Sequence, residues 1–400
     1  MKKILLVVAL FISTFFLSGI KKTSDDLVNI KVGGLLSLTG NWSSLGVTSQ
    51  EAMNIAVKEI NSRMEQTGSR YRFSITIYDT KLDSTLALAA IKEAFQNNIR
   101  YIIGPQSSTE VQAITNFANA NGILVVSQGS TAGSLAIPGD AIFRFCPGDN
   151  IEADVMSQAM YGSGGRALIS ISRDDVGNMG LQQAIGKAFL SRGGTVDAIA
   201  PWSPTLPDFS GILATVKSKI QQRSTEVGAD KVAVYLASFD RAKELFQQAS
   251  ADPIFSSVRW YGGDGIALSS ELLSDAGASS FAVAARFFAP TLGLPQQVNP
   301  ALVTVSEAIK NKTGIQPDAY SLAVYDALWV IARTVAAFPE PPNDFTKVKE
   351  TFHREANQYY GITGPMHLNA AGDRSKGNFD YWGIVNQSGT YRWKWVGRSL

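Results

Sequence analysis

Two short loops carry the residue types that could hold a small ligand. They are Gly104-Pro105-Gln106-Ser107-Ser108-Thr109 and Ser127-Gln128-Gly129-Ser130-Thr131, and each follows an apolar run, at 101–103 and 123–126. Open α/β sheets bind ligands at the carboxyl ends of their strands. Short hydroxyls and free backbone N–H groups at a helix start suit a carboxylate or another small anion. Because neither loop contains His, Cys or Lys, the pattern predicts binding rather than catalysis.

Sets of residues that could perform catalysis or hold a metal are scarce in this chain. Its two histidines are His353 and His367, far from the two loops. The segment Gly129-Ser130-Thr131-Ala132-Gly133 places its serine one position too early for a nucleophile elbow. The sequence contains no Cys or His cluster with metal-ligand spacing. We therefore expect a protein that is not an enzyme and that has no cofactor and no metal.

The elements that must position the loops alternate between strand and helix patterns. Strands are predicted at 28–36, 71–78, 101–103 and 123–126, and helices at 49–60 and 84–96, with Ser49 as the N-cap of the first. A second series follows, with helices near 151–161, 181–190, 209–221 and 241–249 and strands at 166–171, 195–200, 231–236 and 259–262. This alternation is typical of parallel sheets flanked by helices.

The late part of the chain predicts how the two series are joined. Residues 297–355 have a helical pattern, and short strand-like runs follow at 366–368, 381–385 and 391–395. We expect two doubly wound α/β lobes, with residues 28–146 and 288–361 in lobe 1 and 147–287 and 362–400 in lobe 2. The chain would cross between them near 146–150, 286–291 and 360–364. Three crossing strands predict a hinge and a cleft that closes on a ligand.

Composition limits the class of partner. The 400 residues carry a formal net charge of +2 and no long basic run, which argues against nucleic acid. Cys146 is the single cysteine, so an intramolecular disulfide is excluded. We interpret Cys146, which follows Phe143-Arg144-Phe145, as a buried small apolar residue.

The first residues predict export. Lys2 and Lys3 precede a mostly apolar stretch from Ile4 to Leu17, which is short for a membrane span. We assign residues 1–23 to a signal peptide and expect a periplasmic or other extracytoplasmic protein. Leu17-Ser18-Gly19 is similar to a lipoprotein signal, but Ile20 stands where the cysteine that receives the lipid would be.

Motifs along most of the chain resemble those of the branched-chain amino-acid-binding family, the solute-binding proteins of ABC importers. The matching segments run in order from about residue 28 to 385. They are Ile30-Lys31-Val32-Gly33, Leu38-Thr39-Gly40, Tyr78-Asp79, Ile103-Gly104-Pro105, Gly122-Ile123-Leu124, Gly262-Gly263-Asp264-Gly265, Tyr325-Asp326-Ala327 and Gly361-Ile362-Thr363-Gly364. The resemblance implies the type I periplasmic-binding fold. It also implies a small-molecule ligand, a membrane permease as partner and, by family default, a monomer.

The resemblance also implies a ligand site. The family's contacts to the ligand carboxylate fall on Ser108 and Thr131, and its backbone contact to the α-ammonium falls on Gly129. The acid that holds the ammonium falls on Asp264, where the type members have Glu. The alternative roles are helix capping for Ser108 and Thr131 and turn formation for Asp264.

The side-chain pocket departs from the family pattern. Leu45 stands where an aromatic residue is common, with Trp42 three residues earlier, and the second-lobe aromatic positions fall on Val176 and Phe239. Trp42 and Phe239 are candidate ligand contacts, and packing is the alternative role of Trp42. Without aromatic residues at Leu45 and Val176, we expect a wide pocket for a bulky apolar or aromatic side chain.

Two functions follow from this interpretation. The first is an exported binding protein that captures an amino acid between two lobes and delivers it to an ABC importer. The second is a ligand sensor of the same fold, for an amide, a urea or an aromatic carboxylate, that signals to a partner protein.

Overall fold

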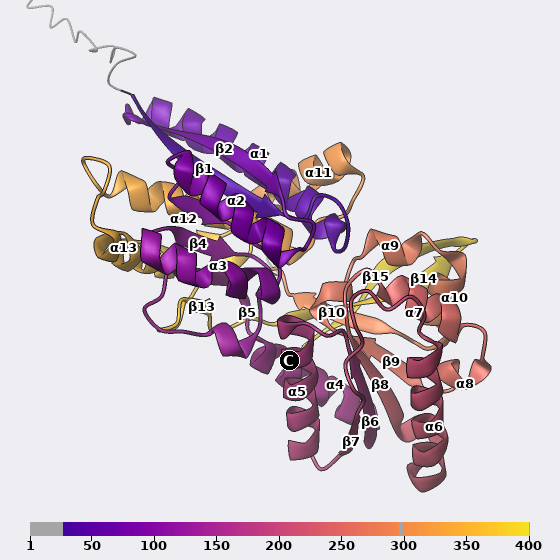
Figure 1. The fold of residues 1–400 in the computed structure, drawn as a ribbon. Coiled ribbons are helices and arrows are strands. Elements are labelled where there is room, and N and C mark those ends of the chain that lie inside the picture. The colour runs from indigo at the N-terminus through magenta and orange to yellow at the C-terminus, as the bar shows by residue number, and fades with distance from the viewer. Residues whose placement is uncertain (1–26, 296–298, 400) are drawn as a thin grey trace, which may run out of the picture.

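Two lobes make up the computed structural model, which describes residues 27–295 and 299–399 (Figure 1). Each lobe is a sheet with helices on both faces. The signal peptide predicted for residues 1–23 lies outside the described residues. Among the described residues, no helix combines the length and the apolar character needed to cross a membrane.

The first lobe contains a parallel six-stranded sheet in the order β13-β5-β4-β3-β1-β2. Helices α2 and α3 cover one face, and α1, α11, α12 and α13 cover the other. The strands are β1 (Val28–Leu36), β2 (Tyr71–Asp79), β3 (Tyr101–Ile103), β4 (Leu124–Ser127), β5 (Ile142–Pro147) and β13 (Asp373–Arg374). The helices are α1 (Ser43–Gln66), α2 (Ser84–Gln96), α3 (Ser108–Asn121), α11 (Pro300–Thr313), α12 (Ala319–Ala336) and α13 (Phe345–Asn357).

The second lobe contains a seven-stranded sheet in the order β15-β14-β10-β9-β8-β6-β7, in which β14 pairs antiparallel with both β10 and β15 and the other pairs are parallel. Its strands are β6 (Ala167–Ser172), β7 (Thr195–Ala198), β8 (Val232–Ala237), β9 (Arg259–Gly262), β10 (Phe288–Leu292), β14 (Phe379–Gln387) and β15 (Thr390–Arg398). Helices α4 (Asp149–Gly162) and α5 (Val176–Ser191) cover one face. The other face carries α6 (Ser210–Val227), α7 (Ala242–Ala249), α8 (Pro253–Ser256) and α10 (Ala276–Ala284), with α9 (Ser270–Leu273) beside them.

The chain passes between the two sheets three times, and two of the passages differ from the expected boundaries. The first follows β5, near 146–150 as expected. The second comes after Leu292, because β10 belongs to the second sheet and not to the lobe assigned to 288–361. The third comes between Arg374 and Phe379, because β13 pairs with β5. The expectation failed there because a two-residue strand leaves no hydrophobic pattern.

The start of α1 is a second correction. The helix begins at Ser43, after Trp42 in the left-handed conformation (φ 58°), and Ser49 is not its N-cap. Polar residues such as Ser43, Ser44 and Thr48 favour a loop over a helix, which is why the pattern predicts a helix start at Ser49. Those hydroxyls are accommodated inside the helix instead, where Thr48 Oγ1 donates to the Ser44 carbonyl at 2.8 Å. As a result, α1 reaches the cleft between the lobes with its first turn.

Candidate functional site

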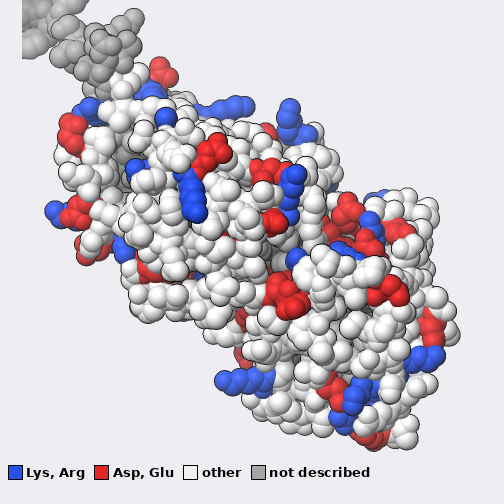
Figure 2. Space-filling view, in the orientation of Figure 1, with Lys and Arg blue, Asp and Glu red and all other residues white. Residues whose placement is uncertain are grey.

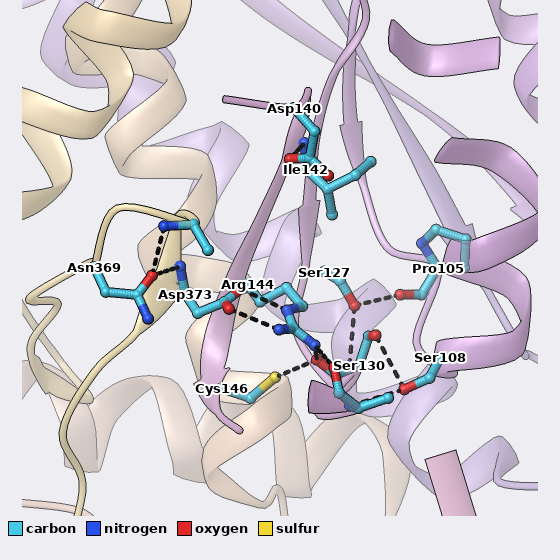
Figure 3. Close-up of polar contacts among 12 residues, drawn as sticks. Pro105, Ser108, Ser127, Ser130, Asp140, Ile142, Arg144, Cys146, Asn369 and Asp373 are labelled. Carbon is cyan, nitrogen blue, oxygen red and sulfur yellow. Dashed lines mark hydrogen bonds and ion pairs between the residues drawn. The ribbon is translucent and has the colours of Figure 1, made fainter. Parts of the chain in front are cut away.

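A buried arginine holds the second loop, residues 127–132, in place (Figure 3). Arg144 donates to both oxygens of Asp373, at 2.5 and 2.7 Å, and to the carbonyls of Ser130 and Ala132, at 3.2 and 2.6 Å. Cys146 Sγ also donates to the Ser130 carbonyl, at 3.3 Å. A bidentate, hydrogen-bonded pair satisfies both buried charges. The pair therefore fixes the loop, and Cys146 is buried and unpaired by disulfide, as the sequence predicted.

Ser108 lies where the two loops meet. Its Oγ accepts a hydrogen bond from the Ala132 N–H at 3.2 Å and one from Ser130 Oγ at 3.1 Å (Figure 3). Ser107, not Ser108, caps α3, since its side chain accepts from the Glu110 N–H in a capping box. With its oxygen accepting two bonds, the Ser108 hydroxyl retains one hydrogen to donate. A Cβ built at Gly177 of α5 would lie 3.4 Å from Ser108 Oγ, so this hydroxyl faces the second lobe.

Trp42 and Phe239 meet across the cleft. Trp42 comes from the first lobe and Phe239 from the second, and their rings stack with centroids 4.6 Å apart at 27°. Leu45 is buried beside them in one apolar cluster. A Cβ at Gly129 would lie 3.0 Å from the Trp42 ring and 3.4 Å from Leu45, so Gly129 lies against the same cluster. Four of the predicted site residues therefore lie together. The space expected to form a wide pocket is occupied by this stack.

Val176 contacts the first lobe through its backbone. Its N–H donates to Thr109 Oγ1 at 3.2 Å, and its side chain packs against the core formed by α2 and α3. Val176 and Phe239 both line a cavity of about 350 Å³ at the edge of the cleft. Arg173, on the same cavity, places its guanidinium 5.3 Å from the Phe239 ring and its Nη1 3.4 Å from Asp175.

Asp264 lies just after β9, on the second-lobe side of the cleft. Its Oδ2 accepts from the Tyr320 hydroxyl at 2.9 Å, and Tyr320 belongs to α12 of the first lobe. Its backbone N–H donates to Glu152 Oε1 at 3.3 Å. Thr131 is joined to the same region, because its carbonyl accepts from the Asp149 N–H at 2.9 Å. The acid, the hydroxyl loops and the aromatic pair thus lie along the contact between the two lobes.

Burial changes the ionisation of the carboxyl groups there. Desolvation raises the pKa of Asp264 to about 6, with the Tyr320 hydroxyl opposing the rise. Desolvation also raises the pKa of Asp149 to about 7, opposed by the neighbouring Thr131 hydroxyl. The pKa of Glu152 lies well above its usual value, because of burial and of repulsion from Asp264 and Asp149. Removing water therefore disfavours negative charge at this end of the cleft.

Sequence reasoning did not find several residues of the cleft. Asp149 and Glu152 had a usable signal, since they follow the end of β5 as the two loops follow β3 and β4. Tyr320 had none, because it is one of three aromatic residues in a mostly apolar helix and nothing in the sequence sets it apart. Ser44 and Ser270 also join the lobes, with hydroxyls 3.0 Å apart. Within the described part of the chain, no group of three or more His, Cys, Asp or Glu is arranged to hold a metal.

The comparisons with known proteins place the chain in a family. A family model described as the receptor family ligand binding region matches residues 48–387. The chain belongs to this receptor ligand-binding family. Among the curated relatives of this chain, an uncharacterized protein of Methanocaldococcus jannaschii is 27% identical to it. The alignment covers 97% of this chain and 96% of the relative. The leucine-, isoleucine-, valine-, threonine- and alanine-binding protein of Pseudomonas aeruginosa is 23% identical, covering 89% of each chain.

Comparison with solved structures shows the fold of this chain. A leucine-binding protein of Thermotoga maritima superposes with a TM-score of 0.73 at 20% identity, covering 92% of this chain and 98% of its own. A solute-binding protein of R. palustris in complex with benzoate gives a TM-score of 0.71 at 17% identity, covering 93% and 96%. The two lobes therefore form the type I periplasmic-binding fold that the motifs predicted.

Proposed function

We propose that this protein is an exported solute-binding protein that captures an amino acid or a close analogue between its lobes and delivers it to an ABC importer. The observation that carries the proposal is the meeting of candidate ligand residues from both lobes. Trp42 stacks on Phe239, and Tyr320 donates to Asp264. A ligand that contacts both sides stabilises the closed form by its differential affinity for that form.

The polar groups support an amino-acid ligand. Ser108 can donate to a carboxylate from the first lobe, and Asp264 can accept from an ammonium on the second. Charge-assisted hydrogen bonds of this type contribute about 1.5–3 kcal/mol each. The curated relative from Pseudomonas aeruginosa is named for binding amino acids, which agrees with this class of ligand.

Export and partner belong to the same proposal. Residues 1–23 would direct the chain out of the cytoplasm, and a membrane permease would accept the ligand from it. On the face shown in Figure 2, acidic and basic side chains are interspersed over both lobes. We propose a monomer that binds no nucleic acid, which size-exclusion chromatography with light scattering and a nucleic-acid shift assay would test.

Thermal shift of residues 24–400 against amino acids, amides, ureas and aromatic carboxylates tests the function. A ligand at 100 times its Kd adds about 2.7 kcal/mol to the free energy of unfolding. Asp264→Asn should weaken binding of an α-amino acid about 10- to 100-fold. Asp154→Asn, an exposed position on α4, is the matched control and should leave binding unchanged.

The alternative ligand class has one observation in its favour. The R. palustris neighbour was solved with benzoate, a carboxylate without an ammonium. A hit confined to such carboxylates, with no loss in Asp264→Asn, would remove Asp264 from the proposed role. If no compound in the panel raises the melting temperature, the proposal of a small-solute carrier is wrong.

A further inference from the structure

Three carboxylates converge at the second-lobe end of the cleft. Asp149 is the first residue of α4, Glu152 follows one turn later on the same face, and Asp264 lies opposite at the end of β9. Glu152 Oε1 accepts from the Tyr235 hydroxyl at 2.9 Å and from the Asp264 N–H at 3.3 Å. The residues are 2%, 1% and 8% exposed. Such a group of acids is costly to bury without partners.

Several oxygens of this cluster have no partner. Both oxygens of Asp149, and Oε2 of Glu152, accept no hydrogen bond of proper geometry within the described chain. No ion pair among the described residues includes Asp149, Glu152 or Asp264. The neighbouring cation, Arg144, is already paired with Asp373. The Thr131 hydroxyl lies near Asp149 and is the neighbouring donor named above. Beyond it, three acceptor positions on two fully buried acids are available to a donor.

The negative charge of the ionised carboxylates indicates what kind of donor would bind there. A neutral amino acid brings one ammonium, which Asp264 would receive under the proposed function. Asp149 and Glu152 would then remain without compensation. A second ammonium supplies three N–H donors and one positive charge, which matches the three free oxygens. A metal ion is a poorer match, because the described residues contain no group of three ligands arranged to hold one.

We propose that the cleft selects a ligand with two cationic nitrogens, a basic amino acid or an aliphatic diamine, and that Asp149 and Glu152 bind the second one. This inference rests on the proposed function, since it needs a ligand in the same cleft. The proposed ligand therefore carries a second cation in place of the apolar or aromatic side chain expected from the sequence. The raised pKa values of Asp149 and Glu152 imply that the selectivity increases as the pH rises and these groups ionise.

Matched ligand pairs test the proposal on the unmodified protein. Isothermal titration at pH 8 compares L-lysine with L-norleucine, and 1,4-diaminobutane with 1-aminobutane, which differ by one ammonium. In at least one pair the dicationic member should bind at least 10-fold more tightly. The pair that shows the difference identifies the ligand as an amino acid or as a diamine. The preference should fall when the titration is repeated at pH 5.5.

Single substitutions test whether Asp149 and Glu152 cause the preference for the dicationic ligand. Glu152→Gln and Asp149→Asn keep the side-chain volume and should each reduce the preference at least 10-fold. Asp154→Asn, on the same helix but exposed and paired with Arg192, should leave it unchanged. Equal binding of both members in the two pairs would overturn the inference and leave the proposed function intact. Absence of binding by leucine and by every other panel member would overturn both.

Discussion

Two buried charged clusters lie at the same end of β5, and their bonding differs. Arg144 donates two hydrogen bonds to the Asp373 carboxylate and two more to carbonyl oxygens (Figure 3). Asp149, Glu152 and Asp264 are equally buried, yet three of their oxygens lack partners. The first cluster stabilises the loop that carries Thr131. The second leaves acceptors unused in the cleft.

This difference in hydrogen bonding distinguishes a cluster that stabilises the fold from a cluster proposed to bind a ligand. A buried ion pair costs little when complete and a great deal when one partner is lost. An incomplete cluster is disfavoured in the free protein and becomes favourable when a cation completes it. Buried oxygens without a hydrogen-bond partner are therefore a better guide to a ligand site than buried charge alone. Two substitutions test this comparison, and two more test uncharged contacts that join the lobes.

Asp373→Asn should have the largest effect, because it leaves the Arg144 guanidinium buried without its carboxylate. We expect a loss of about 3–5 kcal/mol in the free energy of unfolding, measured by urea denaturation. The double variant Arg144→Met with Asp373→Leu should recover much of the loss, since it removes both charges. A loss below about 1 kcal/mol in Asp373→Asn would contradict the structural role of the pair.

Asp149→Asn should stabilise the protein, and the gain should depend on pH. The native pKa of Asp149, about 7, exceeds its ordinary value of 3.8, so between these pH values the native state binds more protons than the unfolded state. The stability of the wild type therefore falls as pH rises through this window. The variant escapes the fall, so its advantage should grow from near zero at pH 4 to at most about 4 kcal/mol at pH 8.

Urea denaturation of both proteins at pH 4, 6 and 8 measures that advantage. Asp154→Asn should stay within about 0.5 kcal/mol of the wild type across the series, because Asp154 is exposed and paired only with Arg192. A pH-independent difference for Asp149→Asn would mean that its carboxylate is compensated in the free protein.

Trp42→Ala should shift the lobes toward an open arrangement, since it removes the aromatic stack on Phe239. Such a pair contributes about 0.5–1.5 kcal/mol beyond its buried area. Small-angle X-ray scattering without ligand should show a larger radius of gyration, while Trp42→Phe should remain near the wild type. An unchanged radius in Trp42→Ala would show that the stack does not hold the lobes together.

Ser270→Ala should have the smallest effect. It removes the hydroxyl contact with Ser44 across the cleft and leaves the Ser270 N–H bond to Ser44 Oγ at 3.3 Å. We expect a change in ligand affinity below about 5-fold, in line with a net hydrogen-bond contribution of about 0.5–1.5 kcal/mol. A loss above 10-fold would assign Ser44 and Ser270 to the ligand site.

Much of the architecture could be predicted from local patterns. Strand β1 occurs where its apolar run placed it, because a strand inside a parallel sheet is buried on both faces. Helix α2 occurs where the periodicity placed it, because Ala87, Ala90, Ile91 and Ala94 repeat at the spacing of a helix. The start of α1 was wrong, since hydroxyls that look like loop residues bond within the helix at Thr48. Strand β13 was missed, because two residues carry no periodicity.

The sequence by itself indicated the two-lobed fold and the loops that carry Ser108 and Thr131, because hydrophobic period and turn chemistry are local properties. The resemblance of its motifs indicated the family. Tertiary structure alone decided which residues meet across the cleft. Tyr320 reaches Asp264 over 56 positions of the chain, and Trp42 stacks on Phe239 from the other lobe. It also decided that Arg144 is paired and Asp149 is not, since the partners of a buried charge are set by packing between distant segments.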